Sequence, residues 1–161
     1  MKNNDVEIIQ ASSKQEFDQV RILFREYEAY LNIDISFQDF ENECIELPGK
    51  YAPPSGQLLL CIYNSKIAGC VALKKLQDNI CEMKRLYVRP DYRKKGLGKL
   101  LSTRVIEEAI NMGCATMRLD TLVRLKVAFE LYRSLGFKEI APYYYNPLPD
   151  VVFLELDLKQ R

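Results

Sequence analysis

The sequence predicts a mixed α/β (α+β) fold, in which helices pack on a mostly antiparallel central sheet. First, apolar runs of strand length alternate with longer runs of helical periodicity, in the order β-α-α-β-β-β-α-β-α-β-β. Second, tight polar turns join the middle strands, as in antiparallel hairpins. Third, a helix-length segment separates residues 80–88 from 115–122. Such a crossover makes the two strands that it joins parallel.

No repeat, low-complexity tract or linker interrupts this order, so residues 1–161 are expected to form a single domain. The expected elements are a strand at 6–11, a helix from Ser12 or Ser13 to near Asn32, a helix at 37–47, strands at 57–63, 66–76 and 80–88, a helix at 95–112, a strand at 115–122, a helix at 125–136, and strands at 137–141 and 151–158.

Local signals justify the elements of the N-terminal half. Ser12 or Ser13 followed by Glu16 has the spacing of a capping box, and apolar residues then recur at helical spacing as far as Leu31. The Pro- and Gly-rich stretch PGKYAPPSG ends the second helical segment. Two β-prone runs, QLLLCIY and KIAGCVALKKL, flank the polar turn NSK and therefore predict a hairpin.

The C-terminal half is punctuated by glycine. Gly113 stands just after the apolar helical pattern of 95–112, where a helix C-cap is expected, and Gly136 ends the next helical pattern in the same way. The loop PYYYNPLPD is rich in tyrosine and proline, and the run VVFLELDL after it is a closing strand.

The composition narrows the function classes. Apolar residues make up 48% and charged residues 28% of the chain, and the net charge is +1. No global field draws such a protein to nucleic acid or to a membrane. The N-terminus lacks the apolar core of a signal peptide and no apolar run has bilayer length, so a cytoplasmic location is expected.

The chain has no histidine and five cysteines without a CxxC pair. Nucleophilic catalysis by Ser-His-Asp or Cys-His and histidine-based metal sites are therefore excluded, and no metal is expected. The cysteines are expected to be buried, reduced thiols. Acid–base chemistry must use carboxylates, tyrosine, lysine, cysteine or water.

The segment RPDYRKKGLGKLL, residues 89–101, combines positive charge with backbone freedom at the start of a helix. A helix N-terminus has free N–H groups and a partial positive charge, both of which suit a phosphate. Gly96 and Gly98 lack Cβ atoms, so a large anion can approach the main chain. The basic residues around them are Arg93, Lys94, Lys95 and Lys99. The pattern is not a P-loop, and Leu101 replaces the third glycine of GxGxxG.

This segment resembles motif A of the GNAT superfamily of N-acetyltransferases, which binds the pyrophosphate of acetyl-CoA. RKKGLG fits an (R/Q)-x-x-G-x-(G/A) pattern and follows LYVRPDY, and AFELYRSLGF (128–137) resembles the second signature of the family, A-x-x-L-Y-x-x-x-G-F. The element order matches over nearly the whole chain, most specifically from Glu82 to Phe137. The resemblance implies helices on both faces of the sheet. It also implies transfer of an acetyl group from acetyl-CoA to a primary amine of a small molecule, amino acid or peptide, by direct attack in a ternary complex.

The resemblance also implies residues for the donor side. Those expected to bind acetyl-CoA are Leu86, Tyr87, Val88, Arg93, Lys94, Lys95, Gly96, Leu97, Gly98 and Lys99. The first three end the strand whose main chain pairs with the pantetheine arm and polarises the thioester carbonyl in the resembling enzymes. Tyr132 matches a tyrosine that donates a proton to the departing sulfur, with packing on the sheet as its alternative role. Leu125 replaces an asparagine that contacts the CoA arm in many relatives.

A base is useful because an amine of the lysine type, with a pKa near 10.4, is protonated at pH 7. Glu82 is the favoured candidate, since some family members hold a base at the matching position. Asp120, on the next strand, is the rival, because other members place a glutamate there. Asp120 shares a strand face with Arg118, so an ordinary ion pair is an equal alternative. Water alone is the third possibility.

Charged residues in the strand 80–88 favour a cleft beside it, because a central strand buries charge at high cost. Strict alternation places Glu82, Lys84 and Leu86 on one face, and Met83, Arg85 and Tyr87 on the other.

The acceptor pocket is expected between the first two helices and the tyrosine-rich loop. Tyr27 and Tyr144 are candidates to line it, and Arg85 or Arg118 to bind a carboxylate of an amino-acid-like acceptor. Packing of the tyrosines over the sheet edge and ordinary ion pairs are the alternatives. The sequence does not name the amine.

Two other function classes stay open. A non-catalytic CoA-binding regulatory module would keep the glycine segment and tolerate the loss of Tyr132 and Glu82, which are both present. A nucleic-acid-binding domain would use the basic stretch 89–99, against which the balanced charge argues. A free strand edge near the C-terminus makes a homodimer possible.

Overall fold

The structure is a computed structural model that describes residues 5–161, and its centre is a seven-stranded sheet. The strands are β1 (Val6–Gln10), β2 (Gly56–Tyr63), β3 (Lys66–Gln77), β4 (Ile80–Val88), β5 (Thr116–Leu122), β6 (Lys138–Ile140) and β7 (Val151–Asp157). Their order across the sheet is β1-β2-β3-β4-β5-β7-β6. Neighbouring strands are antiparallel, apart from β4 and β5, which are parallel. The predicted mixed, mostly antiparallel sheet is confirmed.

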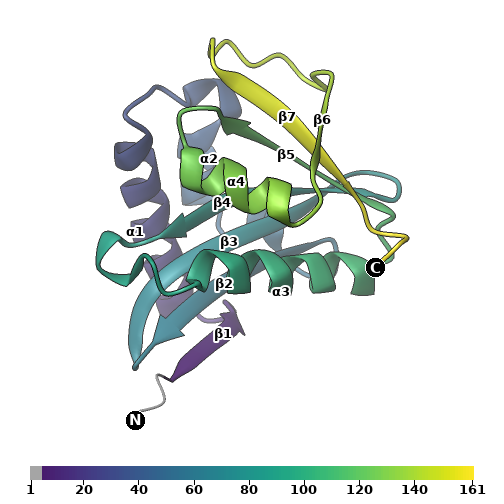
Figure 1. Cartoon of the computed structure of the whole chain (residues 1–161). Helices are drawn as coiled ribbons and strands as arrows, with labels where there is room; N and C mark the ends of the chain where they lie inside the picture. Colours follow the sequence, from purple (N-terminus) through teal and green to yellow (C-terminus); the bar gives the residue numbers. More distant parts are fainter. Residues whose placement is uncertain (1–4) are drawn as a thin grey trace.

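Helices cover both faces of the sheet, as expected. They are α1 (Lys14–Leu31), α2 (Phe40–Ile45), α3 (Leu97–Asn111) and α4 (Lys126–Ser134). Figure 1 shows α3 and α4 in front of the sheet, with α1 and α2 behind it. Each face has its own apolar core, one containing Leu101 and Val105 of α3 and the other Leu23 and Phe24 of α1. Among residues 5–161, no helix has the length and apolar character needed to cross a bilayer.

The first helix has the predicted boundaries. The Glu16 N–H donates to Ser13 Oγ at 3.1 Å, and Glu16 Oε1 accepts from the Ser13 N–H at 3.0 Å, so the capping box is formed. Asn32 ends the helix in the left-handed conformation, with φ of 51°. The buried face of the helix packs on the sheet and carries Tyr27 toward β4.

The prediction of one continuous helix over 37–47 is wrong. The structure has a 3₁₀ turn, η1 (Ser36–Gln38), followed by the six-residue α2. Asp39 lies between them with φ of 58°, a left-handed conformation that an α-helix does not contain. Its Oδ1 accepts from Asn42 Nδ2 at 3.0 Å, a local bond that the apolar periodicity of this segment does not reveal.

The two later helices are shorter than predicted because glycine adopts left-handed conformations at or near their ends. The α3 helix begins at Leu97 rather than Lys95, since Gly96 has φ of 77°. The α4 helix begins one residue later than predicted and ends before Gly136, whose φ is 102°. Gly113, with φ of 82°, follows the α3 C-cap as predicted.

The strand β4 contains a bulge at Arg85. Ala72 pairs with Lys84, and Cys70 pairs with Tyr87, so β4 uses one more residue than β3 over this stretch. Arg85 itself has φ of 60°. An extra residue shifts the alternation of side chains by one position, so every residue after it exchanges faces.

The predicted alternation along β4 is therefore wrong beyond Lys84. Met83 packs in the core under α3, as the alternation requires, and Leu86 joins that same face. Arg85 and Tyr87 turn to the opposite face, toward α1 and α2. The bulge thus brings Lys84 and Arg85, consecutive cations, to the same side of the sheet.

Candidate active site

The strands β4 and β5 are paired over only part of their length. Their parallel ladder consists of Ile80 with Thr116, Cys81 with Met117 and Glu82 with Arg118. Farther along, β4 pairs with β3 and β5 pairs with β7, and the two neighbours diverge. A cavity of about 310 Å³, hereafter the main cavity, opens where the ladder stops.

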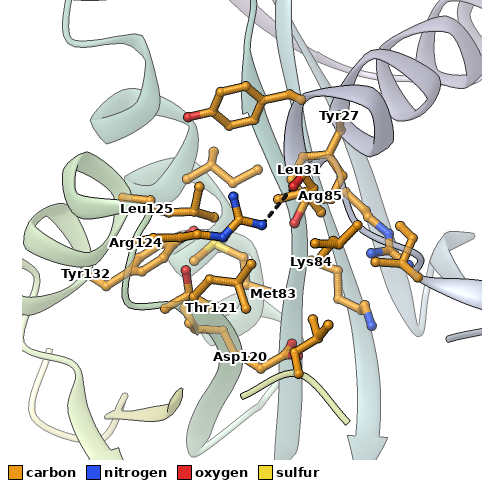
Figure 2. Close-up of a pocket in the computed structure, with 18 of the residues that line it drawn as sticks. Tyr27, Leu31, Met83, Lys84, Arg85, Asp120, Thr121, Arg124, Leu125 and Tyr132 are labelled. Atoms are coloured by element: carbon orange, nitrogen blue, oxygen red, sulfur yellow. Dashed lines mark hydrogen bonds between the residues drawn. The ribbon is translucent and has the colours of Figure 1, made fainter. Parts of the chain in front are cut away.

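Several elements contribute walls to the main cavity (Figure 2). The lining includes Tyr27 and Leu31 of α1, Met83 to Leu86 of β4, Leu119 to Leu122 of β5, and Leu125 and Tyr132 at α4. Arg124 extends across the cavity, and its Nη2 donates to the Leu31 carbonyl at 2.7 Å. This bond ties the loop before α4 to the C-terminal end of α1.

The glycine segment forms an open helix N-terminus. Within the described chain, no side chain caps α3. Its first backbone bond runs from the Leu100 N–H to the Gly96 carbonyl at 3.1 Å, so the amides of residues 97–99 have no acceptor within the helix. A Cβ on Gly96 would meet no atom within 4 Å, and one on Gly98 would meet only Leu131 Cδ2, at 3.6 Å. The main chain is therefore accessible to a large anion.

The predicted basic residues of the segment lie in two settings. Arg93 turns toward the end of β4, where its Nε donates to the Val88 carbonyl at 2.9 Å and its guanidinium lies 4.6 Å from the centre of the Tyr30 ring. The other three, Lys94, Lys95 and Lys99, are exposed around the first turn of α3. Positive charge thus surrounds the free amides.

Of the other residues expected to bind the cofactor, Tyr87, Val88 and Leu97 do not line the main cavity. Leu86 is the exception. The bulge places Leu86 on the wall of the main cavity. The Tyr87 ring packs against α1, and its hydroxyl donates to Glu26 at 3.4 Å. The Val88 carbonyl is bonded to Arg93, and the Leu97 side chain is buried in the core.

Tyr132 lies on the wall of the main cavity (Figure 2). Its ring packs edge-on against Phe137, with the ring centres 5.8 Å apart. Burial raises its pKa well above the ordinary value for tyrosine, and the charges of Tyr27 and Asp120 raise it further. The phenol is therefore protonated at neutral pH, as an ordinary tyrosine is, and its burial makes it a weaker acid.

Asp120 also lines the main cavity. Its Oδ2 accepts hydrogen bonds from the Tyr144 hydroxyl and, at 3.0 Å, from Asn146 Nδ2. Both donors converge on one oxygen, which leaves Oδ1 for another group. The alternative of an ion pair with Arg118 is not what forms, because Arg118 Nε bonds to Glu155 Oε2 at 2.8 Å on the neighbouring strand.

Glu82 lies outside the main cavity and lines a neighbouring one of about 410 Å³, hereafter the second cavity. Its Oε2 accepts from the Tyr143 hydroxyl at 2.7 Å. Its Oε1 lies 3.5 Å from Lys74 Nζ and 3.9 Å from Lys84 Nζ. Burial, and then the charge of Glu82, raise the pKa of Tyr143. The two predicted bases therefore face different cavities, and Glu82 is the more fully engaged by protein groups.

Of the three residues predicted for the acceptor side, Tyr144 and Arg85 both bond to Gln38, and the Arg85 guanidinium lies 5.9 Å from the centre of the Tyr27 ring. Tyr27 lines the main cavity and Tyr144 the second, where its hydroxyl accepts from Gln38 Nε2 at 3.2 Å. Arg85 is held by Glu43, with Nε at 2.8 Å from Oε2, and its Nη1 donates to Gln38 Oε1 at 2.7 Å. An acceptor carboxylate at Arg85 would have to compete with Glu43.

The sequence interpretation assigned no role to Lys84 or Gln38, which line both cavities. The charge of Lys84 in a central strand was a usable signal, since it predicted a cleft beside β4. No local pattern marked Gln38, because η1 reaches the site only through the tertiary fold.

Comparisons with known proteins place this architecture among acetyltransferases. A family model described as the acetyltransferase (GNAT) family matches residues 17–137. An N-acetyltransferase of Schizosaccharomyces pombe is 38% identical over 162 residues, covering 99% of this chain and 99% of its own length. An N-acetylaspartate synthetase of Xenopus tropicalis is 29% identical over 130 residues, covering 80% of this chain and 45% of its own.

Solved structures share the fold. An acetyltransferase of the GNAT family from Staphylococcus aureus Mu50 superposes with a TM-score of 0.81 at 24% identity, covering 96% of this chain and all of that one. The PaiA N-acetyltransferase of Thermoplasma acidophilum, solved in complex with coenzyme A, has a TM-score of 0.72 at 21% identity, covering 95% of this chain and 99% of that one.

Proposed function

Because the chain belongs to the acetyltransferase (GNAT) family, an enzyme family that uses acetyl-CoA, we propose that it acetylates a primary amine of a small molecule, amino acid or peptide by direct attack in a ternary complex. The whole of residues 1–161 is proposed to form one domain of this kind. The observation that carries the proposal is the main cavity, where the ladder between β4 and β5 ends and where Tyr132 and Asp120 share the walls.

The donor is proposed to bind along the diverging strands, with its pyrophosphate at the start of α3. The free amides of residues 97–99 and the exposed lysines around them suit two phosphates. Gly98 lies against Leu131 of α4, the helix that carries Tyr132, so a diphosphate held there is close to the cavity. Beyond Glu82 the edge of β4 that faces β5 has no ladder partner, so its main chain is proposed to pair with the pantetheine arm there. The coenzyme A bound by the PaiA enzyme supports this use of the fold.

The chemistry then needs two proton transfers. The amine nitrogen attacks the thioester carbonyl, a C–N bond forms, and the C–S bond breaks. Tyr132 is proposed to donate its phenolic proton to the departing sulfur, since its side chain lies on the wall of the main cavity and a phenol is protonated at neutral pH. The proton that the attacking amine loses passes to a carboxylate or to water.

We assign that carboxylate to Asp120 rather than to Glu82. Asp120 lines the main cavity and its Oδ1 is available, whereas both oxygens of Glu82 face protein groups. The Tyr144 and Asn146 donors hold the Asp120 carboxylate in one orientation. Glu82 would act as the base only through the second cavity.

The test is acetyl-CoA turnover by the purified chain. Thiol release is followed with a panel of amines, amino acids and peptides, and calorimetry measures acetyl-CoA binding. We expect binding, and thiol release with at least one acceptor. Asp120→Asn is expected to lower kcat by about 100-fold, and Glu82→Gln by less.

The other results are decisive as well. If acetyl-CoA binds but no acceptor in the panel causes thiol release, the result would support the non-catalytic regulatory module instead. If neither binding nor release is detected with folded protein, the proposal fails. A larger loss from Glu82→Gln than from Asp120→Asn, with acetyl-CoA binding intact in both, would transfer the role of base to Glu82.

A further inference from the structure

The main and second cavities meet at two residues. Of all the residues that line either cavity, Gln38 and Lys84 are the ones common to both. The Lys84 Nζ lies 3.5 Å from Gln38 Oε1, and the Lys84 side chain is only 8% exposed. A molecule that approaches the main cavity through the second one must therefore pass a nearly buried ammonium group.

The cations of the second cavity differ in how closely they are paired. The Lys50 Nζ lies 2.9 Å from Glu43 and the Arg118 Nε 2.8 Å from Glu155, so each has a near partner. Lys74 and Lys84, by contrast, share the single carboxylate of Glu82 at 3.5 Å and 3.9 Å. The other oxygen of that carboxylate accepts from Tyr143.

Two ammonium groups thus share one carboxylate, and neither has another carboxylate within 4 Å among the described residues. Both lysines line the second cavity, where the side chain of Lys84 is nearly buried and that of Lys74 is 23% exposed. Burying such charge is unfavourable unless a further anion completes the site. A bound carboxylate would supply that anion.

We propose that Lys84, assisted by Lys74, binds a carboxylate of the acceptor, so that the acceptor class is free amino acids rather than simple amines. This rests on the proposed function, because it assigns the amine of that function to a molecule with a second, anionic group. The acceptor carboxylate lies at Lys84, and its amine faces Asp120, which shares the cavity wall with Lys84 (Figure 2).

The surroundings of Lys84 are consistent with a site that gains from an incoming anion. Burial and the charge of Arg85 lower the pKa of Lys84 to about 8, against the opposing charges of Glu82, Asp120 and Glu43. The side chain is thus still largely protonated at neutral pH, and a carboxylate beside it would favour the charged form further.

The experiment compares amino acids with their own carboxamides. The common L-amino acids and β-alanine are each assayed against the corresponding α- or β-carboxamide, which retains the amine and loses the negative charge. We expect at least one acid to exceed its amide by about tenfold or more in kcat/KM, since hydrogen bonds to charged groups are the stronger ones. In Lys84→Met this ratio should fall toward one through a rise in KM for the acid, with kcat for the amide little changed.

Two variants control the comparison. Lys84→Arg keeps the charge and should keep a preference for the acid. Lys75→Met makes the same substitution on an exposed residue of β3 that lines neither cavity, and should leave the ratio unchanged. Amides acetylated as well as acids, or equal losses for both in Lys84→Met, would overturn the inference while leaving acetyl transfer intact. If no acceptor in the panel gives thiol release, both the inference and the proposed function are overturned.

Discussion

The proposed donor side and the proposed acceptor side of this molecule differ in whether backbone or side-chain groups form them. The proposed donor side is mainly backbone, with free amides at the start of α3, a strand end that has no ladder partner on its β5 side, and two glycines that keep side chains away. The acceptor side is a network of side chains, in which Gln38 joins Arg85, Lys84 and Tyr144.

The two sides also differ in the sequence separation of the residues that form them. The anion site at α3 lies within a few consecutive residues. The acceptor network joins η1 to the tyrosine loop over 106 positions, and β4 to α2 over 42. A backbone site depends on local conformation, whereas the network depends on the whole fold and on buried charge. The two sides should therefore fail differently under mutation.

The largest effect is expected at the buried ion pair behind the acceptor network. Glu43 is 2% exposed and bonds to Arg85 and Lys50. Glu43→Ala leaves the Arg85 guanidinium buried without its anion, which costs about 3–5 kcal/mol in the free energy of unfolding. Urea denaturation measures the loss. The neighbouring Glu41→Ala removes an exposed ion pair with Arg25 and should change stability little. Similar losses in the two variants would show that the acceptor network does not depend on this pair.

Tyr132→Phe comes next, at the boundary between the two sides. Loss of the proton donor should lower kcat by about 100-fold, while acetyl-CoA binding by calorimetry stays near the wild-type value. Tyr51→Phe is the matched control, since Tyr51 is buried in the other core and lines neither cavity. An unchanged kcat in Tyr132→Phe would leave the tyrosine with a packing role only.

Lowering the pH should reduce the free energy of unfolding through Glu43, but by less than Glu43→Ala does. Burial alone would raise the pKa of Glu43, but the hydrogen bonds and charge of Arg85, followed by Lys50, lower it to about 2. A carboxyl with a lowered folded pKa contributes stability above its unfolded pKa of 4.5 and loses it as the pH falls toward 2. Between pH 6 and pH 3 this loss is about 2 kcal/mol.

The measurement compares urea unfolding of the wild type with that of Glu43→Gln over this pH range. The variant cannot ionise at position 43, so its stability should fall less steeply. Parallel pH profiles would mean that Glu43 is not held ionised by Arg85.

The same contrast explains what the sequence could predict. The fold followed from periodicity, the capping box at Ser13 and the crossover before β5, because each is a local signal. The open helix N-terminus at Gly96 and Gly98 could be predicted for the same reason. The break at Asp39 and the bulge at Arg85 were missed, since a single left-handed residue leaves the apolar pattern around it unchanged.

The sequence offers candidate residues for the acceptor side but not their arrangement. Glu82 and Asp120 are both candidates for the base by residue type, yet only the packing of β4, β5 and the tyrosine loop decides which cavity each one faces. Arg85 was considered for a ligand carboxylate, and its bond to Glu43 depends on α2, far away in the sequence. The sequence shows that Lys84 is a charged residue in a central strand, where burial is costly. It does not show that Lys84 lies between two cavities.

The smallest effect is expected on the donor side, from Gly98→Ala. The new Cβ would meet only Leu131 Cδ2, at 3.6 Å, and alanine is the better helix former, so the free energy of unfolding should stay level or rise by up to about 1 kcal/mol. Acetyl-CoA affinity by calorimetry should also stay within about threefold of the wild-type value, because the pattern (R/Q)-x-x-G-x-(G/A) accepts alanine at this position and a methyl group leaves the amides within reach of a phosphate. A loss of about tenfold or more would mean that the methyl group blocks the phosphate, and this chain would then need glycine at position 98.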